Sequence, residues 1–404
     1  LQFSNIWHIL KNMKIYYNRL TDIATALETQ SVILFGPRQT GKTSFVKYQL
    51  ADKVAYSFNL LDTALQRRLY LNPGAFKEEI YAQGLHDCIV FVDEIQKYPA
   101  LLDDIHLLIE EKNIRFLLTG SSPRKIKHAG YNMLGGRALN RSFNPFVFME
   151  LPLDVRQSIK LEDIFRHGMI PSIFDSSNAD DKLYSYTETY LKDEIASEGL
   201  VRNVPIFTSF LAFAAKTNTQ IINFSNLAND SGTKRQVITN WYDILIDTLV
   251  GYKVEPWAKG TKRKVPATSK FYFFDPAVAR ILAQQPVPEE TQTEFGTLFE
   301  NYILCELKAY LDYRCKREKI YYWRTQTGSM EVDFIINDIA IEVKAKKDVL
   351  GKDLKGLKAI TEEGSFKHRI VVCKEERSRL TQDGILIINW KLFLEKLGSG
   401  AFDM

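Results

Sequence analysis

The stretch Gly36-Pro37-Arg38-Gln39-Thr40-Gly41-Lys42-Thr43 decides how the first part of this chain folds. It follows the apolar run Val32-Ile33-Leu34-Phe35, which is typical of a buried strand. It leads into Ser44-Phe45-Val46-Lys47-Tyr48, which is typical of the first turns of a helix. A G-x-x-x-x-G-K-[ST] segment between a strand and a helix is a P-loop, whose backbone amides and helix N-terminus hold phosphate oxygens. The alternative is a glycine-containing turn that binds nothing.

Two residues of this loop carry specific chemistry. Lys42 is expected to reach the β and γ phosphates of a nucleotide, and Thr43 is expected to hold Mg²⁺ through its hydroxyl group. The sequence therefore predicts ATP and Mg²⁺ as cofactors. The residues predicted to bind the nucleotide at this loop are Gly36, Pro37, Arg38, Gln39, Thr40, Gly41, Lys42, Thr43 and Ser44.

A second apolar run ends in two acids, Cys88-Ile89-Val90-Phe91-Val92-Asp93-Glu94. This pattern is typical of a central parallel strand whose carboxyl end lies at a site. Asp93 is expected to bind Mg²⁺ through water as the Walker B acid, and Glu94 to orient and polarise the attacking water. The pair favours an ATPase of the AAA-like branch, since the chain lacks the N-K-x-D motif of GTPases. The alternative is a solvated acidic strand end.

Two polar features follow this run. Residues 115–122 predict another buried strand that ends in hydroxyl groups. In AAA-like ATPases a polar residue here senses the γ-phosphate, and we predict Ser121, with Thr119 as the second candidate. A basic segment then ends in Leu134-Gly135-Gly136-Arg137, so Arg137 is predicted to reach a phosphate as an arginine finger, in its own subunit or from a neighbour. A simple Ser-Gly turn and a solvated basic loop are the alternatives.

The composition is that of a globular protein of 404 residues, 45% hydrophobic and 25% charged. This length predicts about two to four domains. The net charge of +4 argues neither for nor against a nucleic-acid partner. The cysteines have no metal-ligand spacing, and no apolar run approaches the roughly 18 residues of a membrane helix, so we expect a cytoplasmic protein without a membrane partner. The start lacks a secretory pattern, and Met13 is a candidate natural start, so residues 1–18 are predicted to be a leader.

The ordered set of motifs resembles a large prokaryotic family of AAA-type ATPases with a conserved tail of unknown function. The nucleotide motifs occur in many ATPases, whereas the ordered set is much more specific and covers nearly the whole chain. Gly135-Gly136-Arg137 stands where the family often has Leu-Ala-Gly-Arg, and residues 168–172 stand where it often has a Gly-Gly-x-Pro turn. Besides the P-loop, the matching motifs lie at residues 92–96, 117–122, 190–193, 270–275, 299–301, 331–334 and 341–344.

The middle of the chain predicts a winged helix, which is a helix-turn-helix followed by two strands. In a DNA-binding protein the start of the second helix enters the major groove, and the wing contacts phosphates. The alternative is a winged helix that only packs against the nucleotide domain or a partner. Helices are expected over residues 206–216, 224–228 and 234–249, and strands over 252–257 and 271–274, around a basic tip at 259–264. The predicted DNA-facing residues are Lys234, Arg235, Gln236, Thr239 and Asn240.

The tail carries a second candidate site. Because strand side chains alternate, Glu342 and Lys344 are expected on one face, with Asp333 converging from the neighbouring strand. This Asp-x₈-Glu-x-Lys pattern resembles the PD-(D/E)XK nuclease-like core. Asp333 and Glu342 would hold Mg²⁺ or Mn²⁺, and Lys344 would orient water or stabilise developing charge. The resemblance implies a further metal contact from Glu300, on a helix expected over residues 294–311. The alternatives are an ordinary charged hairpin and a nuclease-like fold that binds without cutting.

The predicted fold class is therefore α/β, with a P-loop AAA-like ATPase domain built on a parallel sheet, a helical winged-helix domain and a PD-(D/E)XK-like tail. The predicted divisions are residues 1–18, 19–150, 151–203 (a helical linker), 204–285 and 286–404. We expect a protein that hydrolyses ATP and carries a DNA-associated, nuclease-like tail under nucleotide control. The alternative is a STAND-like, nucleotide-switched protein whose tail docks nucleic acid or a protein without cleaving. A protein partner and further copies of the chain are also expected partners.

Overall fold

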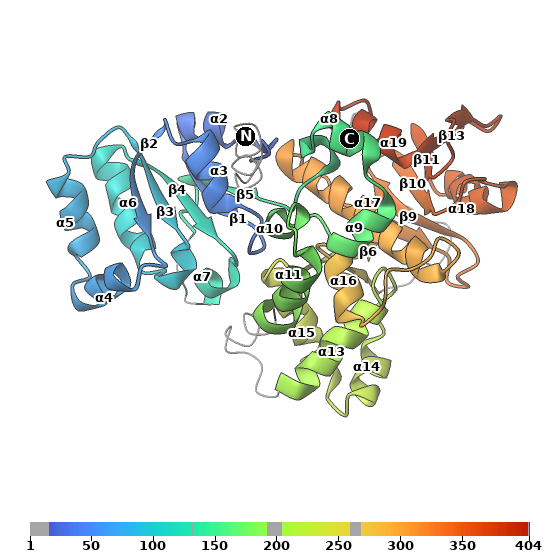
Figure 1. Cartoon of the computed structure of the whole chain (residues 1–404), viewed down its shortest axis with the longest axis horizontal. Coiled ribbons are helices and arrows are strands. Elements are labelled where there is room, and N and C mark those ends of the chain that lie inside the picture. The colour runs from blue at the N-terminus through green and yellow to red at the C-terminus, as the bar shows by residue number, and fades with distance from the viewer. Residues whose placement is uncertain (1–15, 129, 131–132, 192–203, 259–267, 403) are drawn as a thin grey trace, which may run out of the picture.

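The computed structural model describes residues 16–128, 130, 133–191, 204–258, 268–402 and 404. Three predicted features therefore lie outside the described residues: the leader up to residue 15, the end of the linker from residue 192, and the basic tip at 259–264. Figure 1 shows a sheet flanked by helices in the N-terminal part of the chain and a second sheet in the C-terminal part. The predicted α/β class with a parallel sheet is confirmed.

The N-terminal sheet contains the P-loop. Its strands are β1 (Ser31–Phe35), β2 (Val54–Asn59), β3 (Ile89–Asp93), β4 (Arg115–Gly120) and β5 (Ala138–Ser142). They pair in parallel in the order β2-β3-β4-β1-β5, so β4 lies between the P-loop strand and the strand that ends in Asp93. The accompanying helices are α2 (Ile23–Thr29), α3 (Lys42–Gln49), α4 (Thr63–Leu71), α5 (Ala75–Ala82), α6 (Leu101–Lys112), α7 (Arg124–His128) and the 3₁₀ turn η1 (Ile95–Lys97).

Both faces of this sheet are covered, which explains why its central strands are apolar throughout. Ile33 and Phe35 of β1 belong to the core that also contains residues of α5 and α6. The alternate residues, Val32 and Leu34, belong to the core on the other face, with residues of α2 and α3. The carboxyl ends of β1, β3 and β4 are thereby held at one edge of the sheet, where the P-loop begins.

None of the helices in the described part of the chain has both the length and the apolar character that a bilayer crossing requires.

Short helices connect the N-terminal sheet to the rest of the chain. In Figure 1, α13, α14 and α15 form a group at the bottom of the view. The bounds are η2 (Phe148–Glu150), α8 (Leu153–Ser158), α9 (Leu161–His167), α10 (Pro171–Phe174), α11 (Ala179–Ser185), the π-helical η3 (Tyr186–Leu191), α13 (Val204–Lys216), α14 (Phe224–Asp230), α15 (Arg235–Asp247) and α16 (Pro276–Leu282).

The second sheet has eight strands in the order β12-β13-β11-β10-β9-β8-β6-β7. They are β6 (Gly251–Pro256), β7 (Lys270–Phe273), β8 (Tyr321–Arg324), β9 (Glu331–Ile336), β10 (Ile339–Lys344), β11 (His368–Cys373), β12 (Arg379–Leu380) and β13 (Ile385–Asn389). β6 pairs in parallel with β8, Glu255 opposite Tyr321 and Pro256 opposite Tyr322. The two strands predicted as a wing therefore lie in the same sheet as the tail strands. The division at residue 285 stays a prediction.

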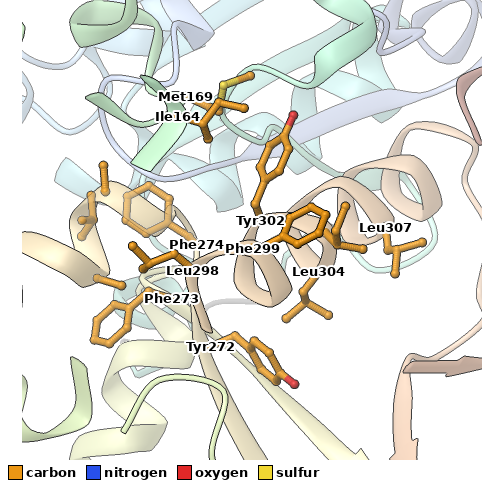
Figure 2. Close-up of a cluster of buried hydrophobic side chains, with 14 of the residues drawn as sticks. Ile164, Met169, Tyr272, Phe273, Phe274, Leu298, Phe299, Tyr302, Leu304 and Leu307 are labelled. Atoms are coloured by element: carbon orange, nitrogen blue, oxygen red, sulfur yellow. The ribbon is translucent and has the colours of Figure 1, made fainter. Parts of the chain in front are cut away.

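The helix α17 (Thr293–Tyr313) runs through the largest hydrophobic core. That core extends from Tyr17 and Phe146 to Met404, so it joins the middle and the tail of the chain. Figure 2 shows Phe299 and Tyr302 of α17 and Phe273 of β7 among the buried side chains of this core. The remaining tail elements are η4 (Gly351–Leu354), α18 (Lys355–Ala359), η5 (Ile360–Glu362) and α19 (Trp390–Gly398).

Candidate active site

The P-loop begins directly after β1, and its glycines are needed for its shape. A Cβ atom on Gly36 would lie 2.1 Å from the carbonyl oxygen of Phe143, which follows β5. Gly41 has a φ of 91°, in the left-handed region, and α3 begins at the next residue, Lys42. The loop therefore ends at a helix N-terminus, where unpaired backbone amides and the helix dipole favour an anion.

Lys42 is buried inside this loop. Its ammonium group donates hydrogen bonds to the carbonyl oxygens of Gly36, at 2.7 Å, and Pro37, at 3.1 Å. The hydroxyl of Thr40 donates to the same Pro37 oxygen at 2.7 Å. A phosphate would offer the ammonium group a charged acceptor in exchange for these neutral carbonyls. Ser44, also predicted at this site, is exposed in the first turn of α3.

Thr43 and Asp93 are brought together although they lie 50 positions apart in the sequence. The hydroxyl of Thr43 donates a hydrogen bond of 2.8 Å to one carboxylate oxygen of Asp93. The hydroxyl of Thr119, on β4, donates to the other oxygen. Hydroxyl and carboxylate oxygens are the hard ligands that Mg²⁺ prefers. This pair therefore fits the predicted magnesium role.

Glu94 follows β3 in a strained conformation. Its φ of 61° and ψ of 48° lie in the left-handed region, which costs a non-glycine residue about 1–2 kcal/mol. The amide nitrogen of Gln96 donates to the Glu94 carboxylate and, at 2.8 Å, to the hydroxyl of Ser121. Gln96 therefore links the predicted catalytic acid to the predicted γ-phosphate sensor. Thr119, the second candidate for that sensor, is engaged by Asp93 instead.

Arg137 lies at the opposite edge of the sheet from the P-loop. It directly precedes β5, whose first residue, Ala138, pairs with Ser31 at the start of β1. Its guanidinium group forms an ion pair of 2.5 Å with Glu110 of α6. The structure therefore does not bring Arg137 to the phosphate loop of its own chain.

A short helix lies beside the P-loop. The hydroxyl of Ser172, on α10, donates a hydrogen bond of 2.6 Å to the side-chain oxygen of Gln39. A Cβ atom on Gly41 would be 4.0 Å from the Cβ atom of Pro171. The segment at residues 168–172 thus touches the loop.

The turn before α10 is attached to the middle of the chain by Asp275. This carboxylate accepts a hydrogen bond of 2.7 Å from the backbone amide of Met169 and caps the N-terminus of α16. Gly168 has a φ of 74°, and a Cβ atom there would lie 2.4 Å from an Asp275 oxygen. Burial raises the pKa of Asp275 to about 6.

The end of α15 contacts the carboxyl edge of the parallel sheet. The carboxylate of Asp247 forms an ion pair of 2.6 Å with Arg124. The backbone carbonyl of Asp247 accepts a hydrogen bond of 3.3 Å from the hydroxyl of Ser122. A cavity of about 470 Å³ opens next to this contact. Its lining includes Gly36, Pro37, Ser142, Tyr252, Lys308 and Asp312. The P-loop, the middle helices and α17 therefore meet at one place.

In the tail, the structure brings Asp333, Glu342 and Lys344 together. The backbone amide of Val343 donates a hydrogen bond of 2.8 Å to Asp333, and the ammonium group of Lys344 pairs with Glu342. Burial and the neighbouring Asp333 carboxylate raise the pKa of Glu342 well above its usual range. The second carboxylate oxygen of Glu342 is buried without a hydrogen-bond partner among the described residues.

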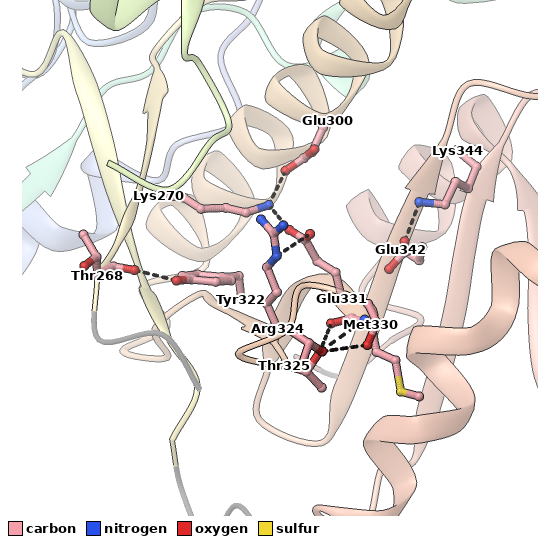
Figure 3. A network of polar contacts seen from close by, with 12 residues as sticks. Thr268, Lys270, Glu300, Tyr322, Arg324, Thr325, Met330, Glu331, Glu342 and Lys344 are labelled. Atoms are coloured by element: carbon pink, nitrogen blue, oxygen red, sulfur yellow. Dashed lines mark hydrogen bonds and ion pairs between the residues drawn. The ribbon is translucent and has the colours of Figure 1, made fainter. Parts of the chain in front are cut away.

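Glu300 has partners that the sequence did not indicate. It accepts hydrogen bonds from the ammonium group of Lys270, at 3.1 Å, and from the hydroxyl of Tyr272, at 2.6 Å. Lys270 also forms an ion pair of 2.6 Å with Glu331, as Figure 3 shows. Burial raises the pKa of Glu300 to about 7. Lys270 therefore occupies the position beside Glu300 where a cation is electrostatically favoured.

The tail fits a metal ion only in part. Asp333 and the unpaired oxygen of Glu342 are suitable hard ligands. However, across the residues that the structure describes, no three His, Cys, Asp or Glu side chains are grouped so that they could hold a metal ion. Glu300, the expected third ligand, is held by Lys270 and Tyr272.

The predicted DNA-facing end of α15 is accessible. Lys234, Arg235, Gln236 and Asn240 are exposed, and Thr239 is half-buried. The guanidinium group of Arg235 lies 5.9 Å from the centre of the Phe224 ring.

Three segments of the chain match described domain families. Residues 28–152 match an AAA domain. Residues 158–289 match a domain of unknown function (DUF8612), and residues 295–393 match another domain of unknown function (DUF4143). The match of residues 28–152 supports nucleotide binding by a P-loop ATPase fold.

Relatives that match most of the chain are also found. Uncharacterized proteins of Mycobacterium bovis and Mycobacterium tuberculosis are each 24% identical over 313 residues, which is 76% of this chain and 67% of the relative. Among solved structures, the Walker-type ATPase of Pyrococcus abyssi aligns with a TM-score of 0.43 and 15% identity, over 68% of this chain and 99% of that chain.

Proposed function

We propose that this protein binds ATP with Mg²⁺ at the P-loop and hydrolyses it. The observation that carries the proposal is the 2.8 Å hydrogen bond between Thr43 and Asp93, which joins the loop to the acid at the end of β3. Lys42 is buried in the same loop. The match of residues 28–152 to an AAA domain supports the same reaction.

Each of these residues has a distinct role in the proposed reaction. When ATP binds, the ammonium group of Lys42 replaces its hydrogen bonds to the loop carbonyls with bonds to the β and γ phosphates, and it neutralises their charge. Bound Mg²⁺ supplies further charge neutralisation next to Thr43 and Asp93. Glu94 orients the attacking water and accepts its proton. Ser121 contacts the γ-phosphate, and Gln96 couples that contact to the Glu94 carboxylate.

The test compares Lys42→Ala with Glu94→Gln in the full chain. Lys42→Ala should abolish binding of a fluorescent ATP analogue and reduce turnover to background. Glu94→Gln should keep the analogue bound while slowing hydrolysis about 100-fold or more. Lys47→Ala, the same substitution at an exposed position of α3, should change neither. Equal loss of binding in the first two variants would contradict the separate roles.

We propose a second activity for the tail, a metal-dependent cleavage of phosphodiesters under nucleotide control. Asp333 and Glu342 would hold the metal ion, and Lys344 would orient the water. The exposed end of α15 would contact DNA, with Arg235 and Gln236 towards the groove. The observation that favours this reading is the convergence of Asp333, Glu342 and Lys344 from two adjacent strands.

Cleavage is measured on supercoiled, linear and single-stranded DNA and on RNA, with Mg²⁺ or Mn²⁺. Asp333→Ala should abolish it, while Asp338→Ala, in the exposed turn of the same hairpin, should leave it unchanged. If the wild-type protein hydrolyses ATP but cuts none of these substrates, the tail does not cleave.

That outcome favours a STAND-like protein that binds a partner under nucleotide control. The ion pairs of Lys270 with Glu300 and of Lys344 with Glu342 support this alternative, because each places a cation beside one of the expected carboxylates without a metal ion. Assembly of the chain on ATP, without nucleic acid, would support it further. Because Arg137 lies far along the sheet from its own P-loop, we assign any role in hydrolysis to a neighbouring copy.

A further inference from the structure

Arg19 is a buried cation that precedes the first described helix and contacts the P-loop. Only 5% of the residue is exposed. Its guanidinium group is sandwiched near two aromatic rings, 4.1 Å from the centre of Phe143 and 5.2 Å from that of Phe146. Its polar partners are the carbonyl oxygens of Thr40 (2.8 Å), Asn144 (2.6 Å) and Pro145 (3.2 Å), the hydroxyl of Tyr313 (2.9 Å) and the carboxylate of Glu150 (2.9 Å).

The bond to Thr40 fixes the orientation of one peptide group in the loop. The carbonyl oxygen of Thr40 and the N–H of Gly41 belong to the same peptide plane, and every described peptide bond is trans. In a trans peptide the C=O and N–H point in opposite directions. Because Arg19 holds the carbonyl oxygen towards itself, the Gly41 N–H is turned to the other side of the loop backbone. A P-loop binds phosphate through backbone N–H groups, so the orientation of this peptide group matters for binding.

The charge of Arg19 is already neutralised by Glu150, whose side chain is fully buried. Arg19 therefore acts on the loop by orienting its backbone more than by adding net positive charge. The planar guanidinium group carries five N–H donors in a fixed, spread-out geometry, whereas the three donors of a lysine ammonium group all lie on one nitrogen atom.

We propose that Arg19 is a positioning residue for nucleotide binding, which holds the P-loop in its phosphate-binding conformation before the nucleotide arrives. This inference rests on the proposed ATP-binding function. Through the hydroxyl of Tyr313, Arg19 also attaches the loop to the last residue of α17.

The test compares Arg19→Lys with Arg280→Lys in the full chain. Arg280 is a matched control, because it is also buried and donates to three backbone carbonyls, those of Phe165, Arg166 and Gln285. Phe165 and Arg166 lie on α9 and Gln285 follows α16, so these contacts lie outside the P-loop. Binding of a fluorescent ATP analogue, steady-state ATP hydrolysis and thermal unfolding are measured for each variant.

Arg19→Lys should weaken analogue binding and raise the KM for ATP about tenfold or more, with kcat within about twofold. Arg280→Lys should leave KM unchanged, even where its melting temperature falls as far as that of Arg19→Lys. The positioning role is overturned if both variants lower stability and neither changes KM. If the wild-type protein binds no ATP, the proposed function itself fails, and that result is distinct from a normal KM in Arg19→Lys.

Discussion

At the scale of single residues, Gly36 shows how little space separates the P-loop from the neighbouring strand. The site of its missing Cβ atom lies 2.1 Å from a backbone oxygen of Phe143, and backbone cannot move aside as a flexible side chain can. The backbone amide of Phe143 is in turn bonded to Phe35 at 2.7 Å. A side chain at position 36 must therefore push β1 and β5 apart.

Gly36→Ala should accordingly destabilise the protein by about 1–3 kcal/mol, as overpacking does in a closely packed core. It should also abolish nucleotide binding, because the loop backbone must shift. Gly296→Ala serves as the control, since a Cβ atom there meets nothing within 4 Å and the position is helical. This control should be neutral or stabilising by about 0.5–1 kcal/mol. Denaturant unfolding of both variants measures the difference, and a neutral Gly36→Ala would contradict the packing argument.

The residues of the P-loop could be predicted because their chemistry is contained in adjacent positions. The P-loop motif identifies Lys42 and Thr43. The rule that the carboxyl ends of parallel strands lie at one edge of a sheet places Asp93 beside them. The contacts of Arg19 could not be predicted in this way. They join positions that are 21 residues apart for Thr40 and 294 apart for Tyr313, and no local pattern marks them. Gln96 lies in the matching motif at residues 92–96, but only its bond to Ser121 reveals a role.

At the scale of elements, Lys270 ties a strand, a helix and a second strand together. It lies on β7, and its ammonium group pairs with Glu300 of α17 and Glu331 of β9. Removing one partner from such a buried group leaves like charges without compensation. The three elements therefore depend on one side chain.

Lys270→Met should lower the free energy of unfolding by about 3–5 kcal/mol. Adding Glu300→Gln should restore part of this loss, because the substitution removes one of the two uncompensated carboxylates. Lys319→Met, at an exposed position before β8, should change stability by less than about 0.5 kcal/mol. Denaturant unfolding measures the free energy of each variant. If the losses from Lys270→Met and Glu300→Gln simply add in the double variant, the proposed pairing is excluded.

A buried acid on α17 gives the protein a pH dependence. Glu306 accepts a hydrogen bond of 2.8 Å from the backbone amide of Phe148, and burial raises its pKa to about 8. The folded chain therefore keeps a proton that the unfolded chain releases near the ordinary pKa of 4.5. Between these two values stability should fall as pH rises, by at most about 1.4 kcal/mol per pH unit for this one proton.

Glu306→Gln should flatten this dependence, because an amide cannot ionise but can still accept the Phe148 hydrogen bond. Unfolding free energies of both proteins are compared at several pH values between about 5 and 8. Glu395→Gln, at an exposed position of α19, should keep the wild-type slope. An unchanged slope in Glu306→Gln would show that this carboxyl group is ionised in the folded protein.

The extent of α15 agrees with the helix expected at residues 234–249, and α17 extends the helix expected at 294–311 by only a few residues. These elements have strong apolar periodicity or clear polar boundaries. The strands β5, β11 and β13 were not predicted. Short apolar runs of this kind do not distinguish a strand from a buried helix without knowledge of their partners. Their partners, such as β10 for β11, come from elsewhere in the chain.

At the scale of the whole molecule, the middle and the tail share a sheet and a core. β6 pairs with β8, and one hydrophobic core contains residues from Phe146 to Met404, with Tyr17 as its one member from before residue 146 among the described buried residues. Residues 145–404 should therefore unfold in one cooperative transition. Residues 286–404 alone lack β6, β7 and Lys270, so they should show no cooperative transition and should aggregate through the exposed edge of β8. Thermal circular dichroism of the two fragments measures this, and a cooperative transition in the shorter fragment would establish an independent tail.

The pairing of β6 with β8 also has a consequence for the order in which a ribosome produces this protein. The parallel sheet is complete once residue 142 has emerged, because all five of its strands lie before that point. The hairpin of β6 and β7 emerges later, yet its parallel neighbour begins only at Tyr321, and the second carboxylate partner of Lys270 is Glu331. A nascent chain therefore carries an unpaired strand edge until β8 emerges, and Lys270 lacks one of its two carboxylate partners until Glu331 emerges. A transcript with an early stop codon in this interval would yield a nucleotide-binding unit attached to a segment that chaperones and proteases recognise as unfolded.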